Sequence, residues 1–240
     1  ELLDGSHMAE ILGNKALAEK WRSMADVTIK NFKTVFWYEA FSFFYDYIDT
    51  NGGRVGRIRP NAFVGLVAAG KVDLVSYKRR ERMVQTALEE GLIASHGVRS
   101  LAPSDPLYKG VDSSTWDPPA YHNGDVWPWL SGSVIQVFAD VGYVDESSKL
   151  LRALVDDILG KGNIGSITEI MDGDKDVPKG CWAQAWSVAE FLRAYYQVFL
   201  GVRQTLDGVK ISPHPIVNVN NFSATSKIRG TMMETCFSYG

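Results

Sequence analysis

The chain has 240 residues, of which 45% are hydrophobic and 22% charged, so it can bury a sizeable core as an ordinary globular protein. Its net charge of −3 indicates no basic face, which argues against nucleic acid or an anionic membrane as a partner. Its apolar runs are shorter than the roughly 20 residues of a membrane span, no secretory leader pattern opens the chain, and two cysteines make no disulfide framework. We therefore expect a cytoplasmic protein.

The first half of the chain predicts helices around one aromatic stretch. An amphipathic helix is expected over residues 9–31, because apolar side chains recur there at four-residue spacing. Periodicity does not decide between strand and loop for residues 36–49. Pro60 is expected at the first position of a helix that continues over residues 61–69. Ser76 is the expected N-cap of the next helix, which runs through about Glu90 and ends at Gly91.

The middle of the chain predicts one long loop and three further helices. Residues 95–124 are rich in proline and glycine, and a loop this long in a compact domain is often functional. Residues 127–141 predict a helix that is buried on most sides, and Asp145 or Glu146 is expected to cap the next one. Another helix, also buried on most sides, is predicted over residues 181–200.

The C-terminal part changes pattern and predicts short strands. Polar and apolar residues alternate over residues 209–212 and 217–220. We expect two portions, a helical one over residues 1–201 and a short-stranded tail over residues 202–240. The body, with about six helices, predicts helical hairpins in which buried helices alternate with amphipathic ones, as in two concentric layers.

One ten-residue segment, residues 120–129, combines aromatic rings with polar side chains in the sequence AYHNGDVWPW. Rings stack on the apolar faces of a pyranose, and neighbouring polar groups bond its hydroxyls. A second segment, residues 165–174, places the carboxylate of Glu169 on a glycine-containing loop before another aromatic helix. These two segments predict a sugar-binding site.

Four segments in the same order resemble the C-terminal glucosidase domain of glycogen-debranching enzymes, the amylo-alpha-1,6-glucosidase family. They are residues 58–61 (IRPN), 97–110, 121–129 (YHNGDVWPW) and 169–187. The resemblance implies a mainly α fold of (α/α)6-barrel helical hairpins with a short C-terminal β segment. It also implies hydrolysis of α-1,6-linked glucose at branches of glycogen or a related α-glucan, with inversion at the anomeric carbon and without a cofactor.

The chain departs from this family pattern in two ways. The family's general acid lies on a Trp-Met-Asp type segment that precedes the first helix predicted here, and this chain lacks that segment. The predicted helices also amount to about half a barrel. An open half-barrel would expose the apolar faces of its inner helices, so self-association into a homo-oligomer is expected.

Glu169 matches the family's general base. Taken alone it is one of 28 acidic residues, for which a solvated or capping role is commoner. The resemblance makes it the expected catalytic residue, because an inverting glycosidase needs a carboxylate that activates water.

The expected sugar-binding residues lie on the same segments and on the loop between them. They are Arg59, Trp116, Asp117, His122, Asn123, Trp127 and Gln184. Trp127 is preferred to Trp129, because residues two apart do not share a helix face. Asp117 is also the best candidate for an acid within the chain. The structural alternatives are that Arg59 braces the rim of the barrel and that His122 satisfies a buried carbonyl.

Two further pairs have simpler interpretations. Asp172 and Asp174 could bind sugar hydroxyls, but turn residues are their commoner role, and without a full calcium-loop pattern no metal is expected. Trp182 and Trp186 are four apart and are expected to share a helix face.

Two other functions fit the same residues. A disaccharide phosphorylase of the same barrel type would use phosphate in place of the activated water and would not need Glu169 as a base. A non-catalytic carbohydrate-binding fragment would bind glucose oligomers without turnover. In each case the expected partner is an α-glucan or an oligosaccharide.

Overall fold

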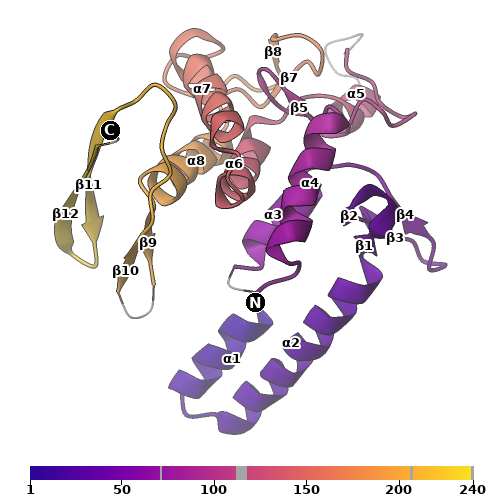
Figure 1. The fold of residues 1–240 in the computed structure, drawn as a ribbon, viewed down its shortest axis with the longest axis vertical. Helices are drawn as coiled ribbons and strands as arrows, with labels where there is room; N and C mark the ends of the chain where they lie inside the picture. Colours follow the sequence, from indigo (N-terminus) through magenta and orange to yellow (C-terminus); the bar gives the residue numbers. More distant parts are fainter. Residues whose placement is uncertain (71, 112–117, 206–207, 239–240) are drawn as a thin grey trace.

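The computed structural model describes residues 1–70, 72–111, 118–205 and 208–238 (Figure 1). The chain begins with a helical hairpin, in which α1 (Leu2–Ile11) packs along α2 (Lys15–Val35). The helix predicted over residues 9–31 is confirmed over residues 15–31, but its first residues belong to α1, before a break at residues 12–14. Apolar residues recur at helical spacing on both sides of the break, so periodicity alone does not reveal it.

The break between α1 and α2 is built from local backbone chemistry. Gly13 has a φ of 76°, in the left-handed region that glycine adopts without strain. The side chain of Asn14 then accepts a hydrogen bond from the Leu17 N–H at 3.1 Å and caps α2. We expect Asn14→Ala to lower the free energy of unfolding by about 1 kcal/mol in urea titrations. Thr28→Ala, on an exposed turn of α2, is the control, and an equal loss in both variants would contradict the capping role.

The aromatic stretch after α2 folds as two small antiparallel hairpins. β1 (Trp37–Tyr38) pairs with β2 (Phe43–Phe44) around the 3-10 turn η1 (Glu39–Phe41). β3 (Tyr47–Ile48) then pairs with β4 (Arg54–Val55). The strands are too short for a two-residue period to show in the sequence, which is why periodicity left this region undecided.

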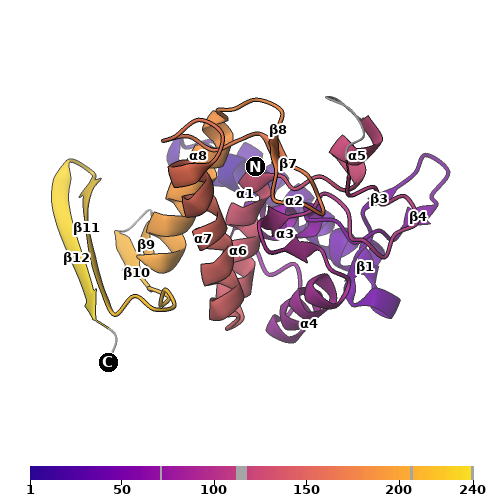
Figure 2. The same cartoon turned by 90° about the horizontal axis from the view of Figure 1, so that it is seen from above.

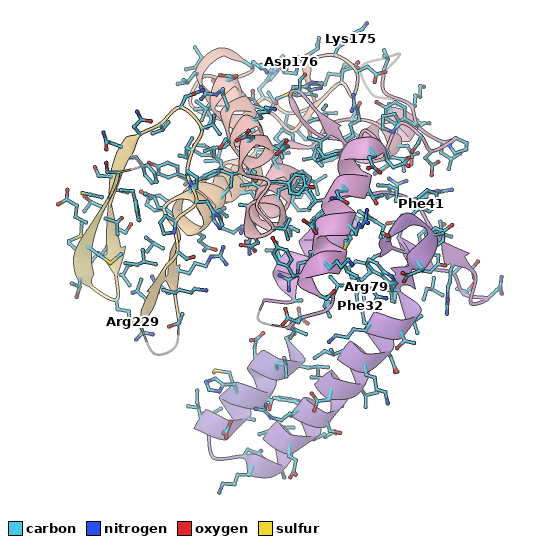
Figure 3. The ribbon with its side chains drawn as sticks, in the orientation of Figure 1. Phe32, Phe41, Arg79, Lys175, Asp176 and Arg229 are labelled. Atoms are coloured by element: carbon cyan, nitrogen blue, oxygen red, sulfur yellow. The ribbon has the colours of Figure 1, made fainter. Side chains whose placement is uncertain are left out.

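Arg79 of helix α4 (Tyr77–Glu89) packs against the β1–β2 hairpin. Its guanidinium group lies 4.4 Å from the centroid of the Trp37 ring. Phe32 of α2 stacks on Phe36 at 4.7 Å, and Figure 3 shows Phe32 and Arg79 where α2, α4 and β1 approach one another. This junction places the following β3–β4 hairpin beside the helical body.

The core of the body forms where α3 (Asn61–Ala68) meets α6 (Ser131–Asp140). Phe63 is fully buried, with its ring 5.7 Å from that of Phe43 and 5.7 Å from that of Phe138. These edge-on contacts join residues that are far apart in the sequence.

The boundaries of α4 confirm the sequence prediction, whereas α3 is one residue shorter than predicted at each end, with Pro60 as its N-cap and Ala69 as its C-cap. The hydroxyl of Ser76 accepts a hydrogen bond from the Arg79 N–H at 3.3 Å and caps α4 as expected. Gly91, with a φ of 70°, follows the end of that helix. These boundaries depend on residues within one turn of each other, so local sequence is enough to define them.

Within its described residues, the predicted long loop contains two short elements. β6 (Gly97–Val98) pairs with β5 (Ile93–Ala94), which directly precedes the loop, and the short helix α5 (Pro118–Asn123) lies near the end of the loop. Residues 112–117 are outside the described part of the chain.

The predicted helix over residues 127–141 is confirmed as a buried element, although it starts as the 3-10 turn η2 (Pro128–Leu130) before α6. The next helix, α7 (Val144–Gly160), has Tyr143 as its N-cap and so begins earlier than a cap at Asp145 or Glu146 would allow. Asp145 and Glu146 lie inside its first turn instead of capping it, where their charges still face the positive end of the helix dipole.

The helix predicted over residues 181–200 is shorter and less buried than expected. It comprises α8 (Ala185–Ala194) and the π-helical turn η3 (Tyr195–Phe199). The N–H of Gln184 donates to a loop carbonyl at 2.9 Å, so the residues before α8 pair with that loop and are not helical. Trp186 remains 46% exposed, which corrects the prediction that this helix is buried on most sides.

Four strands in two antiparallel hairpins follow Gly201. They are β9 (Val202–Gln204), β10 (Val209–Ile211), β11 (Asn221–Ile228) and β12 (Thr231–Ser238). The strand predicted over residues 209–212 is confirmed, but the one over 217–220 is wrong, because Asn218 has a φ of 65° in a tight turn. Figure 2 shows the β11–β12 hairpin at the edge of the molecule, beyond β9 and β10.

Within the described residues the fold is mainly helical, with eight α-helices and six two-stranded antiparallel sheets. Helix α6 contacts α3, α7 and α8 and is the most buried of them. None of the described helices combines the length and the apolar character needed to cross a membrane.

Candidate active site

A cleft of about 470 Å³ opens between the β3 region, the start of α3, α5 and the start of α8. The lining residues that matter most for its chemistry are Asp46, Arg59, Tyr121, Trp127, Trp129 and Trp186. A volume of this size falls in the range of small-ligand sites, and the mixture of rings with a few polar groups is typical of them.

Three tryptophans form one side of the cleft, which we call the aromatic wall: Trp127, Trp129 and Trp186. Trp129 stacks on Trp186 with ring centroids 5.2 Å apart and 23° between the planes, and Trp127 meets Trp186 edge-on at 6.1 Å. The expectation that Trp127 alone faces the site rested on helix geometry, but Trp127 is extended (φ −113°, ψ 104°), so both tryptophans line the cleft. Trp182 precedes α8 and does not share a helix face with Trp186, which corrects that prediction.

Asp46, Arg59 and Asn61 line another side of the cleft, which we call the polar rim. Within it, Arg59 connects three chain segments. One terminal nitrogen donates to the carbonyls of Ser100 (2.8 Å) and His122 (2.7 Å). The other donates to Oδ1 of Asn123 at 2.6 Å. Its Nε pairs with Asp46 at 3.0 Å. The expected ligands Arg59 and Asn123 therefore bond to each other at the rim, and the side chain of Asn123 does not line the cleft.

Asp46 is a cleft residue that the sequence did not single out. Its side chain is 8% exposed, and its two oxygens pair with Nε of Arg59 and with the amide of Asn61 at 2.9 Å. It lies between β2 and β3, in a stretch whose pattern predicted no element. The one sequence feature that could have identified Asp46 is the aromatic Phe-Tyr-Asp-Tyr run around it. Such a composition is too common to identify a ligand.

Glu169 lies beside the cleft, behind Tyr121. The hydroxyl of Tyr121 donates to Oε1 of Glu169 at 2.7 Å. The N–H of Cys181 donates to Oε2 at 2.8 Å, and the N–H of Glu169 donates to the Cys181 carbonyl at 2.9 Å. Both oxygens of a half-buried carboxylate are thus held by donors from two different parts of the fold.

Partial burial by itself would raise the pKa of Glu169. Hydrogen bonds from the Cys181 backbone and from the side chains of Tyr121, Cys181 and Gln184 favour the charged form and outweigh burial, so the pKa is lowered below its ordinary value. Glu169 is therefore ionised at neutral pH, the state in which a carboxylate can accept a proton from water.

A short hairpin after Glu169 brings Cys181 back to it. β7 (Ile170–Met171) pairs with β8 (Pro178–Lys179). Lys179 forms an ion pair with buried Asp172 at 3.0 Å. Asp172 thus stabilises this hairpin through Lys179, and Asp174 stabilises it by accepting a hydrogen bond from the Tyr108 hydroxyl at 2.7 Å. Both roles agree with their interpretation as turn residues.

Two further contacts hold the hairpin in place. Nε2 of His96 lies 2.8 Å from the carbonyl oxygen of Asp172. At the outer tip, Figure 3 labels Lys175 and Asp176, and Asp176 pairs with Lys161 at 2.5 Å. The hairpin is thus tied both to the 95–110 loop and to the end of α7.

Two phenols in this region lead us to expect an alkaline limit on stability. Burial, with hydrogen bonds to Asp174 and Glu169, raises the pKa of both Tyr108 and Tyr121 to about 12. A group whose pKa is higher in the folded than in the unfolded state stabilises the folded state fully below the unfolded pKa, which is about 10 for tyrosine. This contribution is lost as the pH rises from about 10 to about 12. We expect the free energy of unfolding to fall across this window, and to fall less steeply in Tyr108→Phe. Parallel curves for the two proteins in urea titrations would contradict this.

Of the other expected site residues, two lie at the site and two lie outside the described part of the chain. His122 is exposed at the cleft, with its ring 5.0 Å from that of Tyr121, and Gln184 lies beside Glu169 through a side-chain hydrogen bond. Trp116 and Asp117 lie outside the described residues. Trp129 and Trp186 were not among the expected sugar-binding residues, although Trp129 lies in the 120–129 segment and Trp186 in the 169–187 segment that resembles the family.

The part of the chain that the structure describes contains no group of three or more His, Cys, Asp or Glu side chains arranged to hold a metal ion. Cys181 and Cys236 are both free and exposed thiols.

Solved structures of glycoside hydrolases share this fold at low sequence identity. The GH63 mannosylglycerate hydrolase from Thermus thermophilus, in complex with glucose, matches with a TM-score of 0.58 and 18% identity over 78% of this chain and 43% of that chain. Neutral trehalase from Saccharomyces cerevisiae matches with a TM-score of 0.53 and 17% identity over 74% of this chain and 30% of that chain. A structure described as a sialidase matches with a TM-score of 0.78 and 16% identity over 99% of this chain and 22% of that chain.

These likenesses concern the fold, and the chain spans less than half the length of each of these proteins. A search of curated proteins gives no match. The sequence profile of the amylo-alpha-1,6-glucosidase family matches residues 5–193, which contain the aromatic wall, the polar rim and Glu169. The chain therefore belongs to the amylo-alpha-1,6-glucosidase family, a family of glycoside hydrolases.

Proposed function

We propose that this chain supplies the base side of a glycosidase active site, with Glu169 as general base and the cleft as its sugar subsite. The observation that carries the proposal is the placement of the Glu169 carboxylate. It is bonded at both oxygens by Tyr121 and Cys181 at 2.7 and 2.8 Å, and Tyr121 lines the cleft. A fixed, ionised carboxylate beside rings that can stack on a sugar is what water activation at an anomeric carbon requires.

The proposed reaction follows the inverting route. The Glu169 carboxylate accepts a proton from a water molecule as the water oxygen forms a bond to the anomeric carbon. The glycosidic bond breaks, its oxygen takes a proton from a separate acid, and the released sugar has the opposite anomeric configuration. The aromatic wall would carry the apolar face of the glucosyl unit, and the polar rim would bond its hydroxyls.

Asp46 fits a role in binding better than a role as the acid. Its two oxygens already pair with Nε of Arg59 and with the amide of Asn61, and carboxylate oxygens can also accept hydrogen bonds from sugar hydroxyls. An acid must instead hold a proton to deliver to the leaving oxygen. We propose that the acid is contributed by a segment other than those that line this cleft, and Asp117 remains a proposed sugar ligand.

The substrate and the wider fold follow the family. We propose that the glucosyl unit is an α-1,6-linked branch of glycogen or a related α-glucan. We also propose that the helical hairpins form about half of an (α/α)6 barrel, with the cleft among the loops at one end.

The test is an assay of the protein expressed from its complete open reading frame. A limit dextrin that carries α-1,6-linked glucose stubs is the substrate, and free glucose is measured with and without inorganic phosphate. Proton NMR at early times reports the anomer. We expect phosphate-independent release of glucose whose β-anomer appears first, because inversion of an α-linkage gives that product.

The competing functions give different results in the same assay. A disaccharide phosphorylase would release a sugar phosphate only when phosphate is present. A non-catalytic carbohydrate-binding protein would bind glucose oligomers in titration calorimetry and release nothing. Early appearance of the α-anomer would contradict the inverting route.

A further inference from the structure

We propose that Tyr121 is a positioning residue that fixes the carboxylate of the base relative to the aromatic wall. This inference rests on the proposed function, because it assigns Tyr121 a role in the work of Glu169. Tyr121 belongs to the cleft lining and contacts Glu169, which follows it by 48 residues in the sequence.

The geometry of Tyr121 joins the sugar side of the site to the base side. Its hydroxyl donates to Oε1 of Glu169 at 2.7 Å. Its ring meets that of Trp127 edge-on, at 4.6 Å and 78°, and its carbonyl accepts a hydrogen bond from the indole N–H of Trp127 at 3.0 Å. Three contacts thus set the distance between the wall and the carboxylate through one residue.

The second oxygen of Glu169 is held from the opposite side. The N–H of Cys181 donates to Oε2 at 2.8 Å. This approach depends on Gly180, because a Cβ on that residue would lie 2.6 Å from Oε2 and its φ is 69°. Because donors from α5 and from the turn after β8 approach different oxygens, the carboxylate is restricted to one orientation.

The charged and titratable groups around this contact define its pH dependence. The phenol of Tyr121 and the thiol of Cys181 face Glu169, and Asp125 acts on Tyr121 through its charge. Since the pKa of Tyr121 is raised to about 12, the phenol keeps its proton and remains a donor at neutral and mildly alkaline pH. Removing the hydroxyl removes one of the bonds that lower the pKa of Glu169.

Tyr121→Phe tests the inference, because it keeps the ring and the backbone carbonyl and deletes the hydroxyl. In the protein expressed from its complete open reading frame, we expect kcat on limit dextrin to fall about tenfold, as for loss of a hydrogen bond to a charged group. KM should change by no more than about twofold, because the aromatic wall is intact. The acidic limb of the kcat–pH profile should move to higher pH.

A second measurement needs only the folded 240-residue chain. Carboxyl ¹³C NMR of glutamate-labelled protein follows the titration of Glu169, whose signal is assigned by its absence in Glu169→Gln. We expect the midpoint to move to higher pH in Tyr121→Phe. Tyr108→Phe is the matched control, since it also deletes a phenol that donates to a carboxylate, that of Asp174, and should leave the Glu169 titration unchanged.

The outcomes separate the inference from the proposed function. If Glu169→Gln abolishes turnover while Tyr121→Phe keeps the wild-type kcat, pH profile and Glu169 titration, Tyr121 has no positioning role and the base assignment stands. If Glu169→Gln retains turnover, the proposed function fails. Even in that case, a Glu169 titration shifted to higher pH in Tyr121→Phe would show that the Tyr121 hydroxyl bonds the Glu169 carboxylate. A titration shift of equal size in Tyr108→Phe would also overturn the positioning role.

Discussion

Replacing Glu169 with glutamine is expected to reduce glucose release by about a hundredfold or more while substrate binding persists. An amide has nearly the shape of a carboxylate but cannot take a proton from water, and a positioned general base typically contributes a factor of 10² to 10⁴. The site should keep its structure. The amide oxygen can still accept from the Cys181 N–H, and the amide N–H can donate to the Tyr121 oxygen.

The measurement pairs turnover with binding. Limit-dextrin hydrolysis gives kcat, and quenching of the fluorescence of the aromatic wall gives the dissociation constant of a glucose oligomer. Glu190→Gln is the matched control, because Glu190 is a half-buried carboxylate of α8 that pairs with Arg193 at 2.8 Å. We expect that variant to keep wild-type activity. Turnover by Glu169→Gln at the wild-type rate would refute the assignment of the base.

Replacing Arg59 with alanine is expected to lower the free energy of unfolding by about 3–5 kcal/mol, the usual cost of removing one partner of a buried ion pair. The Asp46 side chain is 8% exposed and would lose its positive partner. The carbonyls of Ser100 and His122 and the amide of Asn123 would lose donors at 2.8, 2.7 and 2.6 Å. Because these groups bring three segments to the rim, oligosaccharide binding should weaken as well.

Arg57 offers the control for Arg59. It lines the same cleft, but its side chain is 29% exposed and its single ion pair, to Asp105, is longer at 3.4 Å. We expect Arg57→Ala to lower the free energy of unfolding by less than about 1 kcal/mol. Urea titrations of both variants at one pH make the comparison, and an equally small loss in Arg59→Ala would show that the rim network does not stabilise the fold.

The helices of the body could be predicted wherever their ends depend on nearby residues. Ser76 and Gly91 bound α4 as expected, because a cap and a left-handed glycine act within one turn. The start of the last helix was missed for the opposite reason. The carbonyl of Cys181 and the N–H of Gln184 bond to the loop before β7, and that pairing keeps this segment extended.

The site could be predicted in its chemistry but not in its full membership. The ring-rich segment pointed to a sugar site and contributes Trp127, Trp129 and Tyr121 to the described cleft. Asp46 lies in a stretch without a pattern, and its importance appears only when the fold places it against Arg59. Asn123 was expected to face the sugar, and instead its side chain bonds Arg59.

By itself the sequence determined a mainly helical chain with a ring-rich segment suited to a sugar, and its resemblance to the family added Glu169 as the expected base. Helical periodicity, caps and dense ring-and-polar segments are local properties, set by residues within a few positions of each other. The tertiary structure decided which groups meet: the carboxylate of Asp46 and the guanidinium of Arg59, the hydroxyl of Tyr121 and the carboxylate of Glu169. These contacts join distant segments and depend on how the hairpins pack, so neighbouring residues do not encode them.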